Sequence, residues 1–474
     1  MTCRGGTLPV SKRTEWADDL SLSASGKKLV GKAGIVPVRR LADKVGLTDA
    51  LGAALVRRDF RPVHDRGTVL VSAACAVLLG ARSMAGIDVM RQASLVLGRP
   101  ASASTLWRTL EAIGPVQLTK IASARARTRV HVHQQLDLRP GGFPWIKVNG
   151  RELTGITVLD LDASVVPAHS DKEGAEPNFK GYGHHPLLMF CDNTEELLVN
   201  RLRPGSAGSN TADDHISVSI EGLRQLPTRR RRRVLLRTDG AGATREFLAW
   251  ITSGGGNAAN RWEYSVGHTR DDDFWRALAK GPSHAWTPAL DHKGQPRKDA
   301  GLVEITDMLD LEGWPDGMRV IVRREPIHPK YERELKDYEK KTDYRYQAIA
   351  TNTEGGQLQF LDARARSHTH VEAGIRRSKA LSLNLMPSRY FKVNQAWCTI
   401  LALATDLARW FQLLAVSGKL ARAEPATLRT RLLDVPAKIT DHARRRELKL
   451  DPAWPASTDI VDAWDAVQAL PDPD

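Results

Sequence analysis

The chain has 474 residues, of which 42% are hydrophobic and 26% charged, a balance typical of a globular protein with roughly two to four domains. Its 69 Lys and Arg residues outnumber 55 Asp and Glu, giving a net charge of +14, so nucleic acid is the expected partner because basic surfaces release counterions from phosphates. The four cysteines are widely spaced, which excludes a disulfide framework. No apolar segment free of charges is long enough to span a membrane, which excludes a membrane protein. We therefore expect a cytoplasmic, nucleoid-associated protein.

Residues 1–140 are predicted to form an all-α domain that binds DNA. Within it, residues 86–114 are typical of two helices joined by a short Gly-Pro break, which is the size of a helix-turn-helix. Trp107 and Arg108 lie near the start of the second helix and are the candidate DNA contacts. Any small helical bundle produces the same pattern, so helices with a purely structural role remain the alternative.

A third helix is predicted over residues 116–136. It carries four cations that could follow a phosphate backbone or form a solvated face: Lys120, Arg125, Arg127 and Arg129. Two prolines and two glycines interrupt the pattern between residues 137 and 145, which places the first domain boundary near residue 140.

Residues 141–267 show the alternation of a mixed α/β sheet. Apolar runs predict strands at 156–162, 184–192, 196–205, 234–239 and 261–267, with helices at 210–226 and 245–251. Five arginines precede the fourth strand and are candidate phosphate contacts, with a solvated loop as the alternative: Arg229, Arg230, Arg231, Arg232 and Arg233.

The rest of the chain divides into three regions. Residues 268–360 are polar and rich in strand patterns, which predicts a β-rich insertion subdomain. Residues 361–416 return to helix and are assigned to the same core as residues 141–267. Residues 417–474 are rich in arginine and interrupted by prolines, so a small basic helical region is predicted. The fold class is therefore a multidomain α+β protein whose α/β core is interrupted by a β-rich insertion.

Two of the predicted core strands end in an aspartate. Asp is a poor strand former and costly to bury alone, so it either closes a turn or holds something positive. Neighbouring strands can bring Asp162 and Asp239 side by side although they are far apart in the chain. Paired carboxylates repel one another unless a divalent cation neutralises them, and such hard ligands select Mg²⁺ or Mn²⁺. Asp160 shares a strand face with Asp162 and remains the alternative first acid.

A third acid is expected on the helix that follows the insertion. Glu372 has Arg376 four residues later and Lys379 seven residues later, which puts the three side chains on one helix face. The acid could then ligate metal while the two cations bind phosphate. A surface ion pair between Glu372 and Arg376 is the alternative.

The order of these motifs resembles a known enzyme family. A strand with Asp, a second strand with Asp, a β-rich insertion and a helix with Glu are similar to the DDE transposases of bacterial insertion sequences. The segments that carry the resemblance are DLDASVVPAHSDKEGAEPNFKGYGHHPLL from Asp160, LRPGSAGSNTADDHI from Leu202, LLRTDGAGATREFLAWI from Leu235 and VEAGIRRSK from Val371.

The resemblance implies an RNase H-like core in which Asp162, Asp239 and Glu372 are the catalytic acids and hold two Mg²⁺ or Mn²⁺ ions. It implies cleavage of double-stranded DNA at the terminal inverted repeats of the element, followed by transfer of the 3′-hydroxyl ends to target DNA. A homodimer is expected in the synaptic complex, because two DNA ends must be held together.

The chain departs from the family pattern just before the Glu. Many relatives have an Arg four residues and a Tyr seven residues before it, whereas this chain has His368 and Ala365 there. Arg364 and Arg366 are the candidates to replace that Arg.

Two other functions stay open from the sequence. A stand-alone metal-dependent nuclease would use the same three acids but would cut DNA without joining its ends. A non-catalytic DNA-binding protein derived from a transposase would keep the fold, although the presence of all three acids weighs against it.

Overall fold

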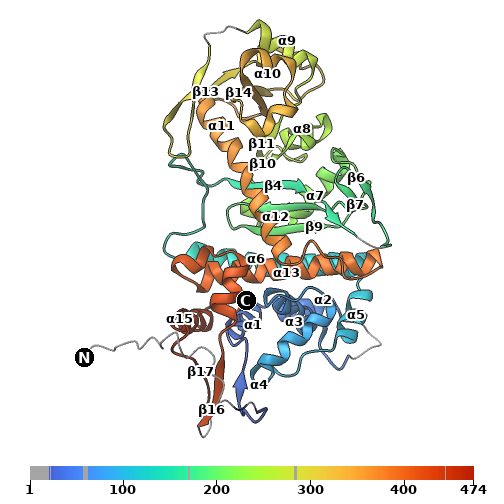
Figure 1. Ribbon diagram of the computed structural model, residues 1–474, viewed down its shortest axis with the longest axis vertical. Coiled ribbons are helices and arrows are strands. Elements are labelled where there is room, and N and C mark those ends of the chain that lie inside the picture. Colours follow the sequence, from blue (N-terminus) through green and yellow to red (C-terminus); the bar gives the residue numbers. More distant parts are fainter. Residues whose placement is uncertain are drawn as a thin grey trace, which may run out of the picture.

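The computed structural model describes residues 21, 23–56, 62–168, 171–281, 285–442 and 445–473. Residues 1–20, the start of the predicted N-terminal domain, lie outside the described residues. The molecule is elongated, with a large sheet standing on a layer of helices (Figure 1). The predicted insertion, with helices α9 (Asp272–Lys280) and α10 (Asp337–Thr342), lies at the end farthest from that layer (Figure 1).

Nine strands form one mixed sheet in the order β12-β13-β14-β15-β11-β10-β4-β8-β9. Five of them come from the predicted core and are rich in buried apolar residues: β4 (Thr157–Ala163), β8 (Leu187–Cys191), β9 (Glu196–Arg201), β10 (Arg233–Thr238) and β11 (Arg261–Gly267). The pairs β4–β10 and β10–β11 are parallel and need crossovers, which include α7 (Ala212–Gln225) and α8 (Arg245–Thr252). The predicted mixed α/β sheet is confirmed.

The insertion continues this sheet instead of forming a separate one. Its strands are β12 (Thr287–Leu290), β13 (Pro296–Glu304), β14 (Arg319–Pro326) and β15 (Tyr344–Thr351). Strand β15 pairs antiparallel with β11 through Ser265, Val266 and Gly267. Backbone hydrogen bonds therefore set the position of the insertion relative to the core strands.

Two helices carry the chain back from the insertion. They are α11 (Leu358–Arg366) and α12 (His370–Ala380), which cross the sheet and lead toward the helical layer (Figure 1). A small sheet of β5 (Val166–Pro167), β7 (Gly181–His184) and β6 (Glu176–Asn178) follows β4. Another short pair is β2 (Lys147–Val148) with β3 (Arg151–Glu152).

The helical layer combines both ends of the chain. Its members are α1 (Ile35–Lys44), α2 (Leu47–Ala54), α3 (Arg66–Leu78), α5 (Ala103–Glu111), α6 (Pro115–Leu138), α13 (Phe391–Ala415) and α15 (Ser457–Gln468). They share one hydrophobic core that includes Leu51, Leu70, Leu110, Trp397 and Trp410. Helices from residues 1–140 pack against α13 and α15 in this core. That residues 1–140 form a domain of their own stays a prediction.

The predicted helix pair at residues 86–114 needs correction. Its first member is a 3-10 helix, Met84–Ala93, followed by the single turn α4 (Ser94–Leu97). The second member is α5, whose N-cap Ser102 accepts a hydrogen bond from the Thr105 amide at 3.2 Å. A glycine, an aspartate and β-branched residues in the first member disfavour an α-helix, so no pair of full α-helices forms.

Two of the four cations predicted on α6 are buried. Arg129 donates to Glu196 on β9 at 2.7 Å and to Asp406 on α13 at 2.6 Å. Arg125 donates to the other oxygen of Asp406 at 2.8 Å, and the His133 ring lies 2.9 Å from Glu196. Although burial opposes it, Arg129 and His133 hold the pKa of Glu196 well below its usual range. A phosphate-contacting or solvated role is therefore wrong for Arg125 and Arg129, which join the helical layer to the sheet.

The C-terminal region, residues 417–474, is less helical than predicted. Strands β16 (Ala437–His442) and β17 (Arg445–Leu450) form an antiparallel hairpin, and β1 (Leu29–Val30) adds a third strand. The hairpin projects from the helical layer at the end of the molecule opposite the insertion (Figure 1). The alternation of polar and apolar residues in both segments favours strand over helix, which explains the difference. The remaining elements are α14 (Pro425–Leu428), short 3-10 and π turns, and α15.

The long apolar helix α13 is a core helix. Among the described residues it is the one helix long and apolar enough to cross a membrane by length and composition, but 89% of that stretch is buried inside the protein. Its Asp406 binds Arg125 and Arg129, and its Arg409 lies 3.4 Å from Glu195. These charges are compensated within the fold.

Breaking the buried ion cluster should destabilise the whole protein. In Arg129→Met, Glu196 and Asp406 stay buried with fewer cationic partners, so we expect the free energy of unfolding to fall by about 3–5 kcal/mol. Denaturant titration followed by tryptophan fluorescence measures the loss. Arg91→Met removes an exposed ion pair with Asp88 and is the control, with an expected cost below about 1 kcal/mol. Equal losses in both variants would show that the cluster does not join the two layers.

Candidate active site

The end of β4 places two aspartates in different surroundings. Asp160 is buried, whereas Asp162, two residues further along the same face, is partly exposed. The Arg237 guanidinium contacts both oxygens of Asp160 at 2.7 Å, and the His368 Nδ1 atom lies 2.9 Å from it. Although burial opposes it, Arg237 holds the pKa of Asp160 below its usual value. Asp160 is therefore committed to a structural ion pair, which leaves Asp162 as the acid available to a ligand.

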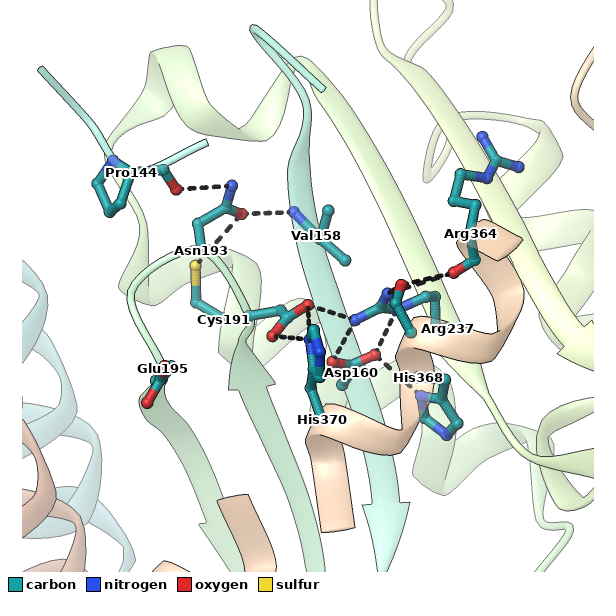
Figure 2. Close-up of polar contacts among 12 residues, drawn as sticks. Pro144, Val158, Asp160, Cys191, Asn193, Glu195, Arg237, Arg364, His368 and His370 are labelled. Carbon is teal, nitrogen blue, oxygen red and sulfur yellow. Dashed lines mark hydrogen bonds and ion pairs between the residues drawn. The ribbon is translucent and has the colours of Figure 1, made fainter. Parts of the chain in front are cut away.

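Arg237 is the centre of a buried polar network (Figure 2). Besides Asp160, it binds the Asp192 carboxylate at 2.6 Å and donates to the Ser367 hydroxyl. His370 approaches Asp192 from the other side, with its Nδ1 atom 3.1 Å from both carboxylate oxygens. Ser367 precedes α12 and His370 is the first residue of this helix. The network therefore connects α12 to β4 and β10.

The second acid follows β10 directly. Strand β10 runs parallel to β4, with Arg237 opposite Asp160 in the register. Continuing that register by two residues brings Asp239 beside Asp162, at the roughly 4.8 Å spacing of neighbouring strands. Asp239 begins a short 3-10 turn by accepting a hydrogen bond from the Ala241 amide at 3.0 Å, and it is exposed.

The third acid, Glu372, lies in the first turn of α12 and is exposed. Gly374, two residues later, packs against the Phe190 ring of β8, and a Cβ atom at this position would lie 3.0 Å from that ring. The glycine thus allows α12 to approach the sheet closely. Neither Glu372 nor Asp162 forms a salt bridge with any side chain that the structure describes.

All three acids line one cavity of about 900 Å³, which also receives side chains from the insertion strands. Burial, the neighbouring Asp239 and, more weakly, Glu372 raise the pKa of Asp162 to about 6. Like charges disfavour ionisation only when they are close. The three predicted acids therefore line the same cavity, and Asp162 is affected by the charges of the other two.

The acid cavity suits a divalent cation by its chemistry. Its donors are carboxylate oxygens, the hard ligands that Mg²⁺ and Mn²⁺ prefer, and their charge is not balanced by salt bridges to described side chains. Within the same described residues, no three His, Cys, Asp or Glu side chains are gathered closely enough to hold a metal ion. An ion would therefore have to draw the carboxylates toward itself.

The two cations predicted on the Glu372 helix lie differently. Burial and Lys180 lower the pKa of Lys379, whereas Asp162 acts in the opposite direction, so Lys379 lies within electrostatic reach of the acids. Arg376 is exposed and binds Glu424 at 2.9 Å. Arg376 therefore pairs with Glu424 and not with Glu372, so the alternative of a Glu372–Arg376 ion pair is not realised. Contacts of Arg376 and Lys379 with DNA stay predictions.

The arginine run 229–233 lies at the opposite end of β10 from Asp239, about 20 Å away by the rise of an extended strand. Arg229 and Arg230 both bind Asp137, while Arg232 and Arg233 are exposed. The run does not line the acid cavity. A phosphate contact by its exposed members stays a prediction.

The remaining predicted residues also separate in space. Trp107 and Arg108 belong to α5 in the helical layer, and their contact with DNA stays a prediction. Of the two arginines considered as replacements for the missing Arg, Arg366 lines the cavity. Arg364 is buried and binds Glu263 at 2.7 Å instead.

Sequence reasoning missed the residues that hold the acids in place. Arg237 precedes Asp239 by two residues, as Asp160 precedes Asp162, so the period-two alternation of two paired strands could have suggested the ion pair. Asp192 carries no such local signal, because its partners come from distant segments.

The raised pKa of Asp162 should make the stability of the metal-free protein depend on pH. Its folded pKa is about 6 against about 3.9 in an unfolded chain, so its ionised form destabilises the fold fully above pH 6 and not at all below pH 4. We expect Asp162→Asn to stabilise the chelator-treated protein at pH 7.5 by up to about 3 kcal/mol, with a gain that shrinks from pH 6 toward pH 4. Thermal melting across this pH range is the measurement.

The control for this experiment is Asp462→Asn, an exposed aspartate on α15. It should give no pH-dependent gain. If Asp162→Asn melted at the wild-type temperature at pH 7.5, the proposed repulsion among the acids would be absent.

Comparisons with known proteins give the family. A model described as transposase DDE domain group 1 matches residues 13–472. Among solved structures, the chain is similar to a piggyBac transposase synaptic complex with hairpin DNA, studied by cryo-EM, with 9% sequence identity, a TM-score of 0.37, and coverage of 79% of this chain and 75% of that chain. No curated protein matches the chain. Because the family model spans nearly the whole sequence, the chain belongs to the DDE transposases of domain group 1 and is a DNA transposase.

Proposed function

We propose that this transposase uses Asp162, Asp239 and Glu372 to bind two divalent cations, Mg²⁺ or Mn²⁺, and to cut and join DNA strands. One observation carries the proposal: three carboxylates from three distant segments line one cavity, and their charges help to raise the pKa of Asp162. DDE transposases generally use divalent metal ions. Bound ions would activate the attacking oxygen and neutralise charge on the leaving oxygen.

The strand order supports an RNase H-like core as part of the proposal. Strands β4, β8 and β9 are sequential and antiparallel, while β10 and β11 add in parallel on the other side of β4. In the proposed division, residues 141–267 and 361–416 form this core, and residues 268–360 are inserted between its second and third acids. The insertion then lengthens the sequence between the second and third acids, while the third acid still lines the same cavity.

The buried network around Arg237 would keep the acids in a fixed relation during the reaction. Asp160 and Asp192 hold the guanidinium, and His368 and His370 connect these two carboxylates to the start of α12. A displacement of α12 would therefore break several hydrogen bonds at once. We propose that these groups orient the acids and do not contact DNA.

We propose that the substrates are double-stranded DNA, first the terminal inverted repeats of an insertion sequence and then a target duplex. The net charge of +14 supports a polyanionic partner. End recognition is assigned to the helical layer, including Trp107 and Arg108. Two protomers would hold two ends together, which makes a homodimer the proposed synaptic state.

A donor plasmid that carries the gene with its native flanking DNA tests the function. With Mg²⁺ or Mn²⁺, the purified protein should cut at inverted repeats in the flanks and join the 3′-ends to new sites, as mapped by sequencing. Asp239→Asn should lower cleavage at least about a thousand-fold, because the ions lose a ligand, yet retain the flanking DNA in a gel shift. Asp162→Asn and Glu372→Gln should behave in the same way.

The exposed-site variant Asp462→Asn is the matched control and should cut like the wild type. Retained cleavage by Asp239→Asn would remove this residue from the site. Cutting without any joined product would instead identify a stand-alone nuclease.

A further inference from the structure

One side of the insertion strands lines the acid cavity. Along β14 and β15, alternate side chains point to opposite faces of the sheet. One face packs into the hydrophobic core through Val320, Val322, Tyr346, Ala348 and Ala350. The other face lines the acid cavity through Ile321, Arg323, Arg345, Gln347 and Ile349. Continuity of the sheet through β11 therefore places basic side chains in the same cavity as the three carboxylates.

Three of the arginines that line this cavity are already paired with carboxylates. Arg270 binds Glu339 at 3.2 Å. Arg323 and Arg366 bind the two oxygens of Asp362 at 2.9 Å and 2.8 Å. Much of their charge is therefore compensated within the fold.

Arg345 lines the same cavity but is held differently. Its guanidinium lies over the Tyr331 ring, 3.6 Å from the ring centroid, and the Lys330 ammonium lies 4.6 Å from the same centroid. Glu325 lies directly opposite Arg345 in the register but pairs with Arg297 and Arg323, and among the described side chains no salt bridge involves Arg345. Stacking on an aromatic ring orients a guanidinium without neutralising it. Arg345 thus offers an oriented positive charge to the cavity.

The acids by themselves would repel the substrate that they are proposed to cut. A DNA phosphate brought near Asp162, Asp239 and Glu372 meets three carboxylates that line one cavity. A cation that lines the same cavity offsets this repulsion. Arginine suits the role, because its planar fork donates two parallel hydrogen bonds to a phosphate.

We propose that Arg345, oriented by Tyr331, binds a backbone phosphate of the DNA strand in the acid cavity and positions that strand for cleavage. The inference rests on the proposed function of the three acids. It assigns to the insertion a direct part in substrate binding. Arg345 acts on the affinity for DNA, whereas the acids act on the chemical step.

Arg324 provides a matched control on the neighbouring strand. Its guanidinium also stacks on aromatic rings, 4.3 Å from the Trp286 centroid and 4.7 Å from the Tyr344 centroid. It lies next to Arg323 in sequence, on the face of β14 that points away from the acid cavity. Arg324→Gln therefore removes the same kind of contact without removing a charge from the cavity.

The test measures initial cleavage rates of the donor plasmid at a series of DNA and salt concentrations. Arg345→Gln should raise the KM for DNA about ten-fold, as expected for one charged hydrogen-bonded contact, with kcat within about two-fold of the wild type. The slope of log affinity against log salt should fall by about 0.9, the value for one phosphate contact. Arg345→Lys should recover part of the affinity, and Arg324→Gln should match the wild type.

The possible outcomes separate the two proposals. A wild-type KM and salt slope in Arg345→Gln would overturn the role of Arg345, as would equal defects in the Arg345 and Arg324 variants. If the wild type fails to cut donor DNA, the proposed function fails. The salt slope of binding to the flanking DNA in a gel shift then decides the role of Arg345 independently.

Discussion

The active site depends on one buried guanidinium. Arg237 sits between Asp160 and Asp192, and the two histidines that follow α11 bind the same carboxylates. A buried charge is tolerated only when it is paired and hydrogen-bonded, so these groups must all be present for any of them to be stable there. The ends of β4 and β10 and the start of α12 are consequently held together. Each of the three acids lies two residues after a member of the network: Asp162 after Asp160, Asp239 after Arg237 and Glu372 after His370.

The three acids of the cavity destabilise the folded protein. Asp162 has its pKa raised to about 6 by burial and by the charges of Asp239 and Glu372, so the site costs stability at neutral pH in the absence of a cation. The Arg237 network offsets this cost locally. A second cluster, centred on Arg129, joins the helical layer to the edge strand β9 by the same principle. In both clusters, one arginine binds carboxylates from elements distant in sequence.

In the proposed site, the insertion matters because its strands extend the sheet that contains β4 and β10. Had it formed a separate body, its arginines would have no defined relation to the acids. The antiparallel pairing of β15 with β11 and the two-residue period of β14 and β15 direct a basic face toward the cavity. Carboxylates and guanidinium groups therefore line the same cavity. That combination is suited to metal ions and a phosphate backbone together.

Apolar patterns in the sequence predict the core strands, a strand-rich stretch over residues 268–360 and helix over residues 361–416, and the acidic motifs indicate the family. Apolar periodicity reports local conformation and the burial of one face, and this was sufficient to predict that Asp162 and Asp239 end neighbouring strands. It was not sufficient for the first member of the helix pair, for the β16–β17 hairpin, or for Arg125 and Arg129, which were expected to face solvent or phosphate. The three-dimensional packing sets which charges are paired. Asp160 binds Arg237, whereas Asp162 and Arg345 line the same cavity. The physical reason is that the partner of a charged side chain comes from a distant segment, and local patterns carry no information about that partner.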